Sequence, residues 1–177
     1  MNDIGLRLAF VAPFVLQAMA FAADEFYYHR RRGLPLWELI GHPCDTFFTL
    51  LCFVFVFWFP PTVTNVSIFI GLAIVSCLSI SKDEVVHYRY CSPPELWLHS
   101  LMFMLHPIML MWIACLWTLQ HHLELGTLLS VSHETVSWCT QFLFSQIVLV
   151  GSILTYQVYT GGKIWLRNPS TTNSTTP

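Results

Sequence analysis

The hydrophobic positions of this chain are gathered into long runs that short polar segments interrupt. The clearest run extends from Thr46 to Ser81, 36 residues without Asp, Glu, Lys or Arg, and it is divided only by Pro60 and Pro61. About 20 apolar residues, each rising about 1.5 Å, cross the hydrocarbon layer, so this run is long enough for two spans joined by a turn. Charged residues and prolines place five predicted spans, at 6–23, 44–59, 62–81, 95–119 and 138–160.

Composition supports a membrane protein. Of the 177 residues, 55% are hydrophobic and only 10% are charged, whereas about a quarter of the residues of a soluble domain are charged. The net charge of −2 and the lack of an extended basic stripe argue against nucleic acid as a partner. We therefore expect an all-α integral membrane protein surrounded by membrane lipid.

The basic residues predict an orientation. All except Arg7 follow the first, third and fifth spans: Arg30, Arg31, Arg32, Lys82, Arg89, Lys163 and Arg167. By the positive-inside tendency this side is cytoplasmic, which places the N-terminus outside and the C-terminus inside. The first span ends in a small-residue sequence, Ala20 to Ala23, that is also typical of a signal-peptide cleavage site. Asp3 beside Arg7 removes the usual positive charge before such a segment, so we expect the span to be retained.

The rest of the chain fits one transmembrane helical domain over 1–167. Apolar residues are scattered among polar ones in segment 120–137, which predicts a short piece lying in the membrane interface. The last segment, 168–177, is rich in Ser, Thr, Asn and Pro and is expected to be a disordered tail.

An internal repeat is the strongest signal in the sequence. One block contains Asp24-Glu25 and later Glu38-x-x-x-His42, and a second contains Asp83-Glu84 and later Glu95-x-x-x-His99. Each block lies where one predicted span ends and the next begins. We therefore expect two tandem helical hairpins of like orientation, over 6–59 and 62–119, with a fifth helix added.

The repeat concentrates acids and histidines. Seven of the ten acids and five of the eight histidines fall in or beside the two blocks, although carboxylates near hydrocarbon are costly. Glu and His are four residues apart in three pairs and three apart in the fourth, so each pair shares a helix face. These pairs are the candidate metal ligands: Glu25, His29, Glu38, His42, Glu84, His87, Glu95 and His99. Further ligands or supporting partners are expected from Asp24, Asp45, Asp83 and His106.

Four carboxylates would balance two divalent cations. This inventory resembles the ferritin-like di-iron and di-manganese carboxylate proteins, in which two helices give a Glu each and two give Glu-x-x-His. Only Glu84 to His87 keeps that strict spacing. The location is also similar to that of the membrane hydroxylases and desaturases, whose histidine boxes this chain lacks. Iron suits a mixed carboxylate and imidazole shell best, with manganese or zinc next.

The sequence thus predicts a di-metal oxidoreductase of the hydroxylase, desaturase or oxygenase type. It would act on a lipid-soluble substrate at the cytoplasmic face and would need an electron donor. Three alternatives stay open: a small membrane haem protein with histidine axial ligands, a metal-ion or proton transporter, and a non-catalytic structural protein whose acids pair with nearby arginines. A haem protein would not explain why glutamates recur at matching positions of the two blocks.

Overall fold

The computed structural model describes residues 3–32, 36–81, 88, 91–122, 126 and 131–167. The described chain is helical, with five helices long and apolar enough to cross a membrane. In order, the elements are α1 (Asp3–Ala23), η1 (Asp24–Tyr28), α2 (His29–Arg32), α3 (Leu36–Trp58), α4 (Val63–Ser81), α6 (Pro93–His121) and α8 (His133–Arg167). The predicted count of five long apolar helices is confirmed, which is consistent with an integral membrane protein.

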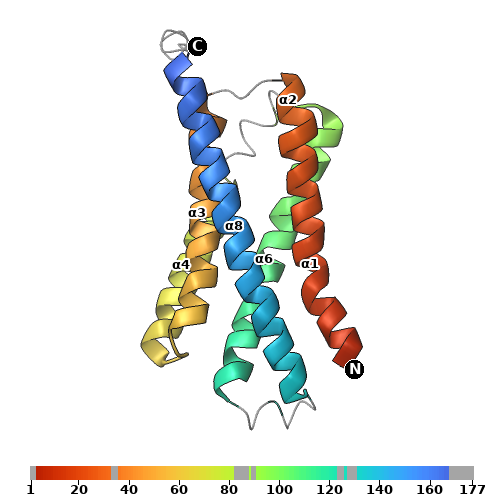
Figure 1. The fold of residues 1–177 in the computed structure, drawn as a ribbon, viewed down its shortest axis with the longest axis vertical. Helices are drawn as coiled ribbons and strands as arrows, with labels where there is room; N and C mark the ends of the chain where they lie inside the picture. Colours follow the sequence, from red (N-terminus) through yellow and green to blue (C-terminus); the bar gives the residue numbers. More distant parts are fainter. Residues whose placement is uncertain are drawn as a thin grey trace.

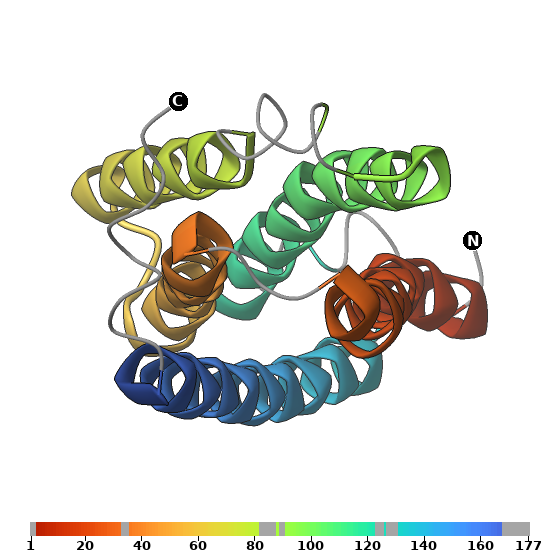
Figure 2. The ribbon, with the colours of Figure 1, turned by 90° about the horizontal axis from the view of Figure 1, so that it is seen from above.

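The helices run side by side as one elongated bundle, with α1 beginning at one end and α8 ending at the other (Figure 1). Seen along the bundle, α3 lies among α4, α6 and α8, whereas α1 lies on the far side of α6 (Figure 2). The most extensive contacts join α3 to α8, α3 to α4, and α1 to α6. The predicted pairing of the first two spans as one hairpin therefore stays a prediction.

Aromatic side chains fill the half of the bundle near the start of α1. Phe10 and Phe14 pack edge-on against Phe142 of α8, with ring centroids 5.9 and 5.5 Å apart. Trp117 is 2% exposed, and its Nε1 donates a 2.7 Å hydrogen bond to the carbonyl oxygen of Phe59, just beyond the end of α3. The buried aromatic therefore also satisfies a backbone carbonyl that the end of the helix leaves without an intrahelical donor.

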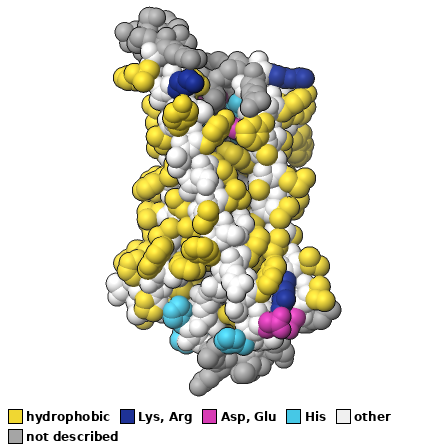
Figure 3. Space-filling view, viewed as in Figure 1, with side chains coloured by type: hydrophobic (Ala, Val, Ile, Leu, Met, Phe, Trp, Pro, Cys, Tyr) yellow, Lys and Arg dark blue, Asp and Glu magenta, His cyan; other side chains and the backbone are white. Residues whose placement is uncertain are grey.

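Apolar side chains cover the middle of the outer face, and Lys and Arg side chains lie toward the two ends (Figure 3). Many large apolar residues are more than one-third exposed, among them Ile70, Met104 and Val158. Water would disfavour so large an apolar surface, whereas lipid accommodates it.

Two helices extend beyond the predicted spans. The second span was predicted at 44–59, but α3 already begins at Leu36, and Pro43 lies inside it. The fifth was predicted at 138–160, but α8 covers His133–Arg167, so the last part of the predicted interfacial segment is helical. The predicted spans were limited by charged or polar residues, and each helix continues past them. The predicted tail, 168–177, and most of 123–130 lie outside the described residues.

Candidate metal centre

Three carboxylates and three imidazoles converge near the end of the bundle where α2 lies. They come from η1, α2, α3 and α6 and form two groups in which ligand atoms lie within 4.8 Å of one another. The first group is Asp24, His29, Glu95 and His99, and the second is His29, Glu38 and His42. His29 belongs to both groups, so the six residues form one continuous cluster.

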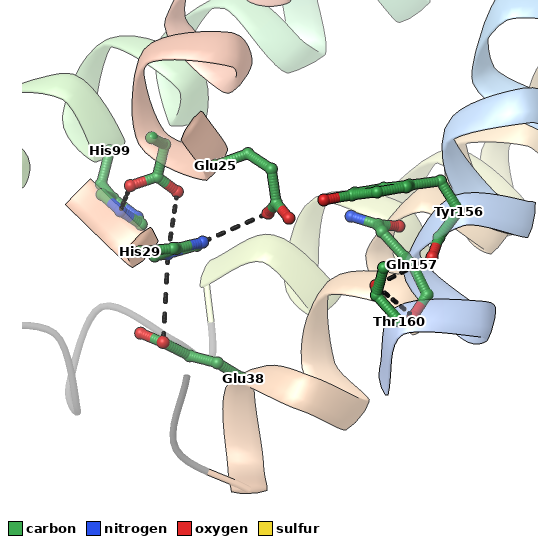
Figure 4. A network of polar contacts seen from close by, with 8 residues as sticks. Glu25, His29, Glu38, His99, Tyr156, Gln157 and Thr160 are labelled. Atoms are coloured by element: carbon green, nitrogen blue, oxygen red, sulfur yellow. Dashed lines mark hydrogen bonds and ion pairs between the residues drawn. The ribbon is translucent and has the colours of Figure 1, made fainter. Parts of the chain in front are cut away.

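His29 stands at the centre of this cluster (Figure 4). Its Nε2 lies 3.3 Å from Asp24 Oδ2 and 3.9 Å from Glu38 Oε2, and its Nδ1 lies 3.2 Å from Glu25 Oε2. Burial works to lower the pKa of His29, but the hydrogen bond to Glu25 and the charges of Asp24 and Glu38 outweigh it and raise the pKa. The surroundings therefore favour a positive charge at this position, whether a proton or a metal ion.

A π-helical turn explains how Asp24 reaches the cluster. In η1 the His29 backbone N–H bonds to the Asp24 carbonyl oxygen, five residues back. This wide turn brings residues five apart onto one face, so Asp24 points inward together with His29. Its other carboxylate oxygen, Oδ1, lies 3.1 Å from His99 Nε2 on α6. Asp24 therefore connects α2 to α6 through two imidazole rings.

The first two turns of α6 hold Glu95 and His99. Pro93 and Pro94 open the helix, and Ser92 and Glu95 form a capping box in which the Ser92 backbone N–H donates to Glu95 Oε2 at 3.2 Å. This bond is a structural role for Glu95. It uses only part of the carboxylate, which can accept about four hydrogen bonds or ligate a metal as well. Glu95 is 2% exposed and His99, one turn later, is 7% exposed.

The first turns of α3 supply the second group. Glu38 is 0% exposed, and His42 follows it by one helical turn, so both point toward η1 and α2. The rings of His42 and His29 have centroids 4.9 Å apart. Burial of Glu38 requires compensation by hydrogen bonds, protons or cations, because a carboxylate is costly to remove from water.

The remaining predicted residues divide into three sets. Glu25 bonds to His29 but belongs to neither ligand group. Asp45 accepts a hydrogen bond from the Ser79 hydroxyl, and His106 Nε2 lies 2.9 Å from Ser76 Oγ, so these two residues meet α4 instead. Asp83, Glu84 and His87 lie outside the described residues.

The Ser76–His106 pair gives a stability prediction. Both side chains are buried, so Ser76→Ala would leave a ring nitrogen of His106 without this partner and cost about 1 kcal/mol. The midpoint of thermal unfolding in detergent should fall, with bound metal unchanged because His106 lies outside the ligand groups. Ser67→Ala on the same helix is the control, since the exposed Ser67 hydroxyl bonds only to the Val63 carbonyl. Equal midpoints for the two variants would contradict a structural role for the pair.

Sequence reasoning missed the part played by the fifth long helix. Tyr156 and Gln157 of α8 lie on the Glu25 side of the cluster (Figure 4). Gln157 is 6% exposed, and within the described part of the chain neither amide atom has a hydrogen-bond partner. Gln157 is one of three glutamines in α8, with Gln141 and Gln146, and the sequence did not indicate which neighbours each would face.

A cavity of about 490 Å³ adjoins the cluster. It lies among α1, α3, α6 and α8, with Asp24, His42 and His99 in its wall at the cluster end. At the other end its wall is formed by Phe14, Phe53 and Met109, and most of the remaining wall is apolar. Its size is within the range of about 300–1,000 Å³ that small-molecule sites occupy.

No protein-family model matches this chain, and comparisons with curated proteins and with solved structures found no match either.

Proposed function

We propose that this chain is an integral membrane protein that binds two divalent metal ions, iron first, and acts as an oxidoreductase on a lipid-soluble substrate. The observation that carries the proposal is the convergence of Asp24, His29, Glu38, His42, Glu95 and His99 in a buried cluster beside an apolar cavity. Such ions would supply oxidation chemistry with dioxygen, of the hydroxylase, desaturase or oxygenase type, and an electron donor would be required.

Charge favours two divalent ions. Together with Glu25, the cluster contributes four carboxylates, namely Asp24, Glu25, Glu38 and Glu95, of which each is at most 8% exposed. Four negative charges equal the charge of two divalent cations. A shell that mixes carboxylate oxygen with imidazole nitrogen suits iron, with manganese and zinc as alternatives.

The position of the core favours a site over a transport path. The cavity ends against Phe14, Phe53 and Met109, and the hydrophobic core, including Phe10, Ile113 and Trp117, fills the bundle beyond it. A transported ion would have to pass this packed region. A substrate that stays in the cavity would not have to pass it.

The proposed orientation places the metal end at the cytoplasmic face. Arg31, which lies at this end beside the cluster, is exposed, as is Lys163 in the last turns of α8. At the other end Arg7 is held 2.9 Å from Glu134, so its charge is locally neutralised. The positive-inside tendency then puts the N-terminus outside and the C-terminus inside.

The direct test is elemental mass spectrometry on the detergent-purified chain, with an ultraviolet-visible spectrum of the same sample. We expect about two iron or manganese ions per chain and no Soret band. Glu38→Gln should lower the metal content, because a neutral amide is a poorer ligand than a carboxylate. Glu134→Gln is the matched control, since Glu134 is exposed at the opposite end. A chain that contains no metal and takes up none when iron is supplied would overturn the proposal.

A further inference from the structure

Among the residues that the structure describes, the exposed part of the cavity lining lies between the helices α1 and α8. Among its lining residues, the exposed ones are Phe26, Leu149, Ser152 and Tyr156, which lie on η1 and α8. Lining residues on α3 and α6 are buried or half-buried. In the space-filling view, Asp or Glu and His atoms are visible between hydrophobic side chains in the upper part of this face (Figure 3).

The opening is a lengthwise slot with closed ends. At one end Phe14 packs on Phe142 with ring centroids 5.5 Å apart, and at the other Phe26 meets Tyr156 at 6.3 Å. Between these contacts, α1 presents the small side chains of Ala18 and Ala22 to the cavity, one turn apart. Small residues usually let helices approach closely, but here they leave space in front of α8.

The depth of the cavity matches one leaflet of a bilayer. Its lining extends over 14–26 on α1 and η1, 42–53 on α3, 99–109 on α6 and 146–156 on α8, with Ile80 of α4 added. Ten residues at about 1.5 Å each give about 15 Å, which is half of the roughly 30 Å hydrocarbon thickness. One end lies at the metal cluster. The other end, toward the middle of the bundle, is mostly apolar, although Gln17, His106 and Gln146 also line it.

We propose that this cavity binds a lipid with a single long hydrocarbon chain, which enters sideways from the leaflet through the slot between α1 and α8. The chain lies along the bundle axis with its tail against Phe14, Phe53 and Met109. Its small polar end lies beside Asp24 and His99. A slot parallel to the helices admits such a chain without moving it through the headgroup region. This inference rests on the proposed function, because it places the substrate's polar end next to the proposed metal ions.

The test uses the full chain in phosphatidylcholine nanodiscs that contain a long-chain fatty alcohol with a diazirine at its tail end. After illumination, peptide mass spectrometry should locate the label on residues of the apolar end of the cavity. Val150→Trp fills the cavity from α8 and should reduce this labelling at least about fivefold. Val148→Trp is the matched control, since Val148 is on the same helix but 55% exposed and outside the cavity lining. Val148→Trp should be labelled to the same extent as the wild type.

A second variant tests whether reduced labelling of Val150→Trp reflects a filled cavity or a misfolded chain. Ala18→Phe narrows the slot from the α1 side and should reduce labelling to a similar degree, with each variant's unfolding midpoint recorded beside the labelling. Equal labelling of Val150→Trp and Val148→Trp would overturn the inference. So would label confined to the outer surface, or cavity labelling by a two-chain phosphatidylcholine that carries the same diazirine. Metal content measured on the same samples separates the two proposals: cavity labelling without bound metal overturns only the metal function, and bound metal without cavity labelling overturns only the lipid site.

Discussion

Replacing His29 with alanine should remove both metal ions and lower the bound metal of the purified chain about tenfold or more. The reason is the position of the ring, which is 3% exposed and is shared by both ligand groups. Its Nε2 faces Asp24 and Glu38 at once. Without the ring, one group loses a ligand and the other loses the imidazole beside it, and the buried carboxylates around it lose the partner that offsets their charge.

His121→Ala is the matched control. His121 is exposed near the end of α6 that is remote from the cluster, and its Nδ1 lies 3.0 Å from the Trp117 carbonyl oxygen. This variant loses an imidazole of the same kind without touching the cluster. If elemental analysis found the same metal content in both variants, the bound metal would lie elsewhere, and the proposed centre would be wrong.

The sequence predicted the helices well where hydrophobicity alone decides their limits. The third span, predicted at 62–81, is α4 at Val63–Ser81, and the fourth, predicted at 95–119, is α6 at Pro93–His121. α3 begins ahead of the predicted span at 44–59, because that span was begun after the charged Glu38. In the structure this glutamate is 0% exposed, so its charge marks a buried site and not a helix boundary.

Part of the site also followed from spacing. Glu25 and His29 were predicted to share a helix face because they are four residues apart, and His29 Nδ1 lies 3.2 Å from Glu25 Oε2. Their role as metal ligands stays a prediction. The role of Asp24 could not be derived in the same way, because an α-helix does not place residues five apart on one face. The π-helical turn places residues five apart on one face, and no single residue in the sequence indicates such a turn.

The cavity could not be predicted because it depends on helix order in space. Ala18 and Ala22 look like ordinary small residues of a span, and Leu149 and Ser152 belong to a helix far along the chain. Only the packing of α1 against α6, with α8 lying across the gap, brings these residues to one slot. Hydrophobic periodicity reports which side of a helix is apolar, but not which helix will face it.

The second large expected effect is that His42 and His99 each support the binding of one of the two metal ions. Each histidine belongs to only one ligand group, His42 with Glu38 and His99 with Asp24 and Glu95. His42→Ala and His99→Ala should therefore each retain about one of two ions, and the double variant should retain neither. Elemental mass spectrometry of the three variants beside His106→Ala makes the comparison. His106→Ala should retain both ions, because its ring contacts Ser76 and not the cluster.

The pattern of loss distinguishes two ions from one. If a single ion were held jointly by both groups, each single variant would lose nearly all of the metal, as His29→Ala does, and the double variant would show no further loss. Half-loss in each single variant with full loss in the double requires two positions of separate ligand sets. His29 is the one residue common to both groups. The metal content of His29→Ala must then equal that of the double variant and be lower than that of either single variant.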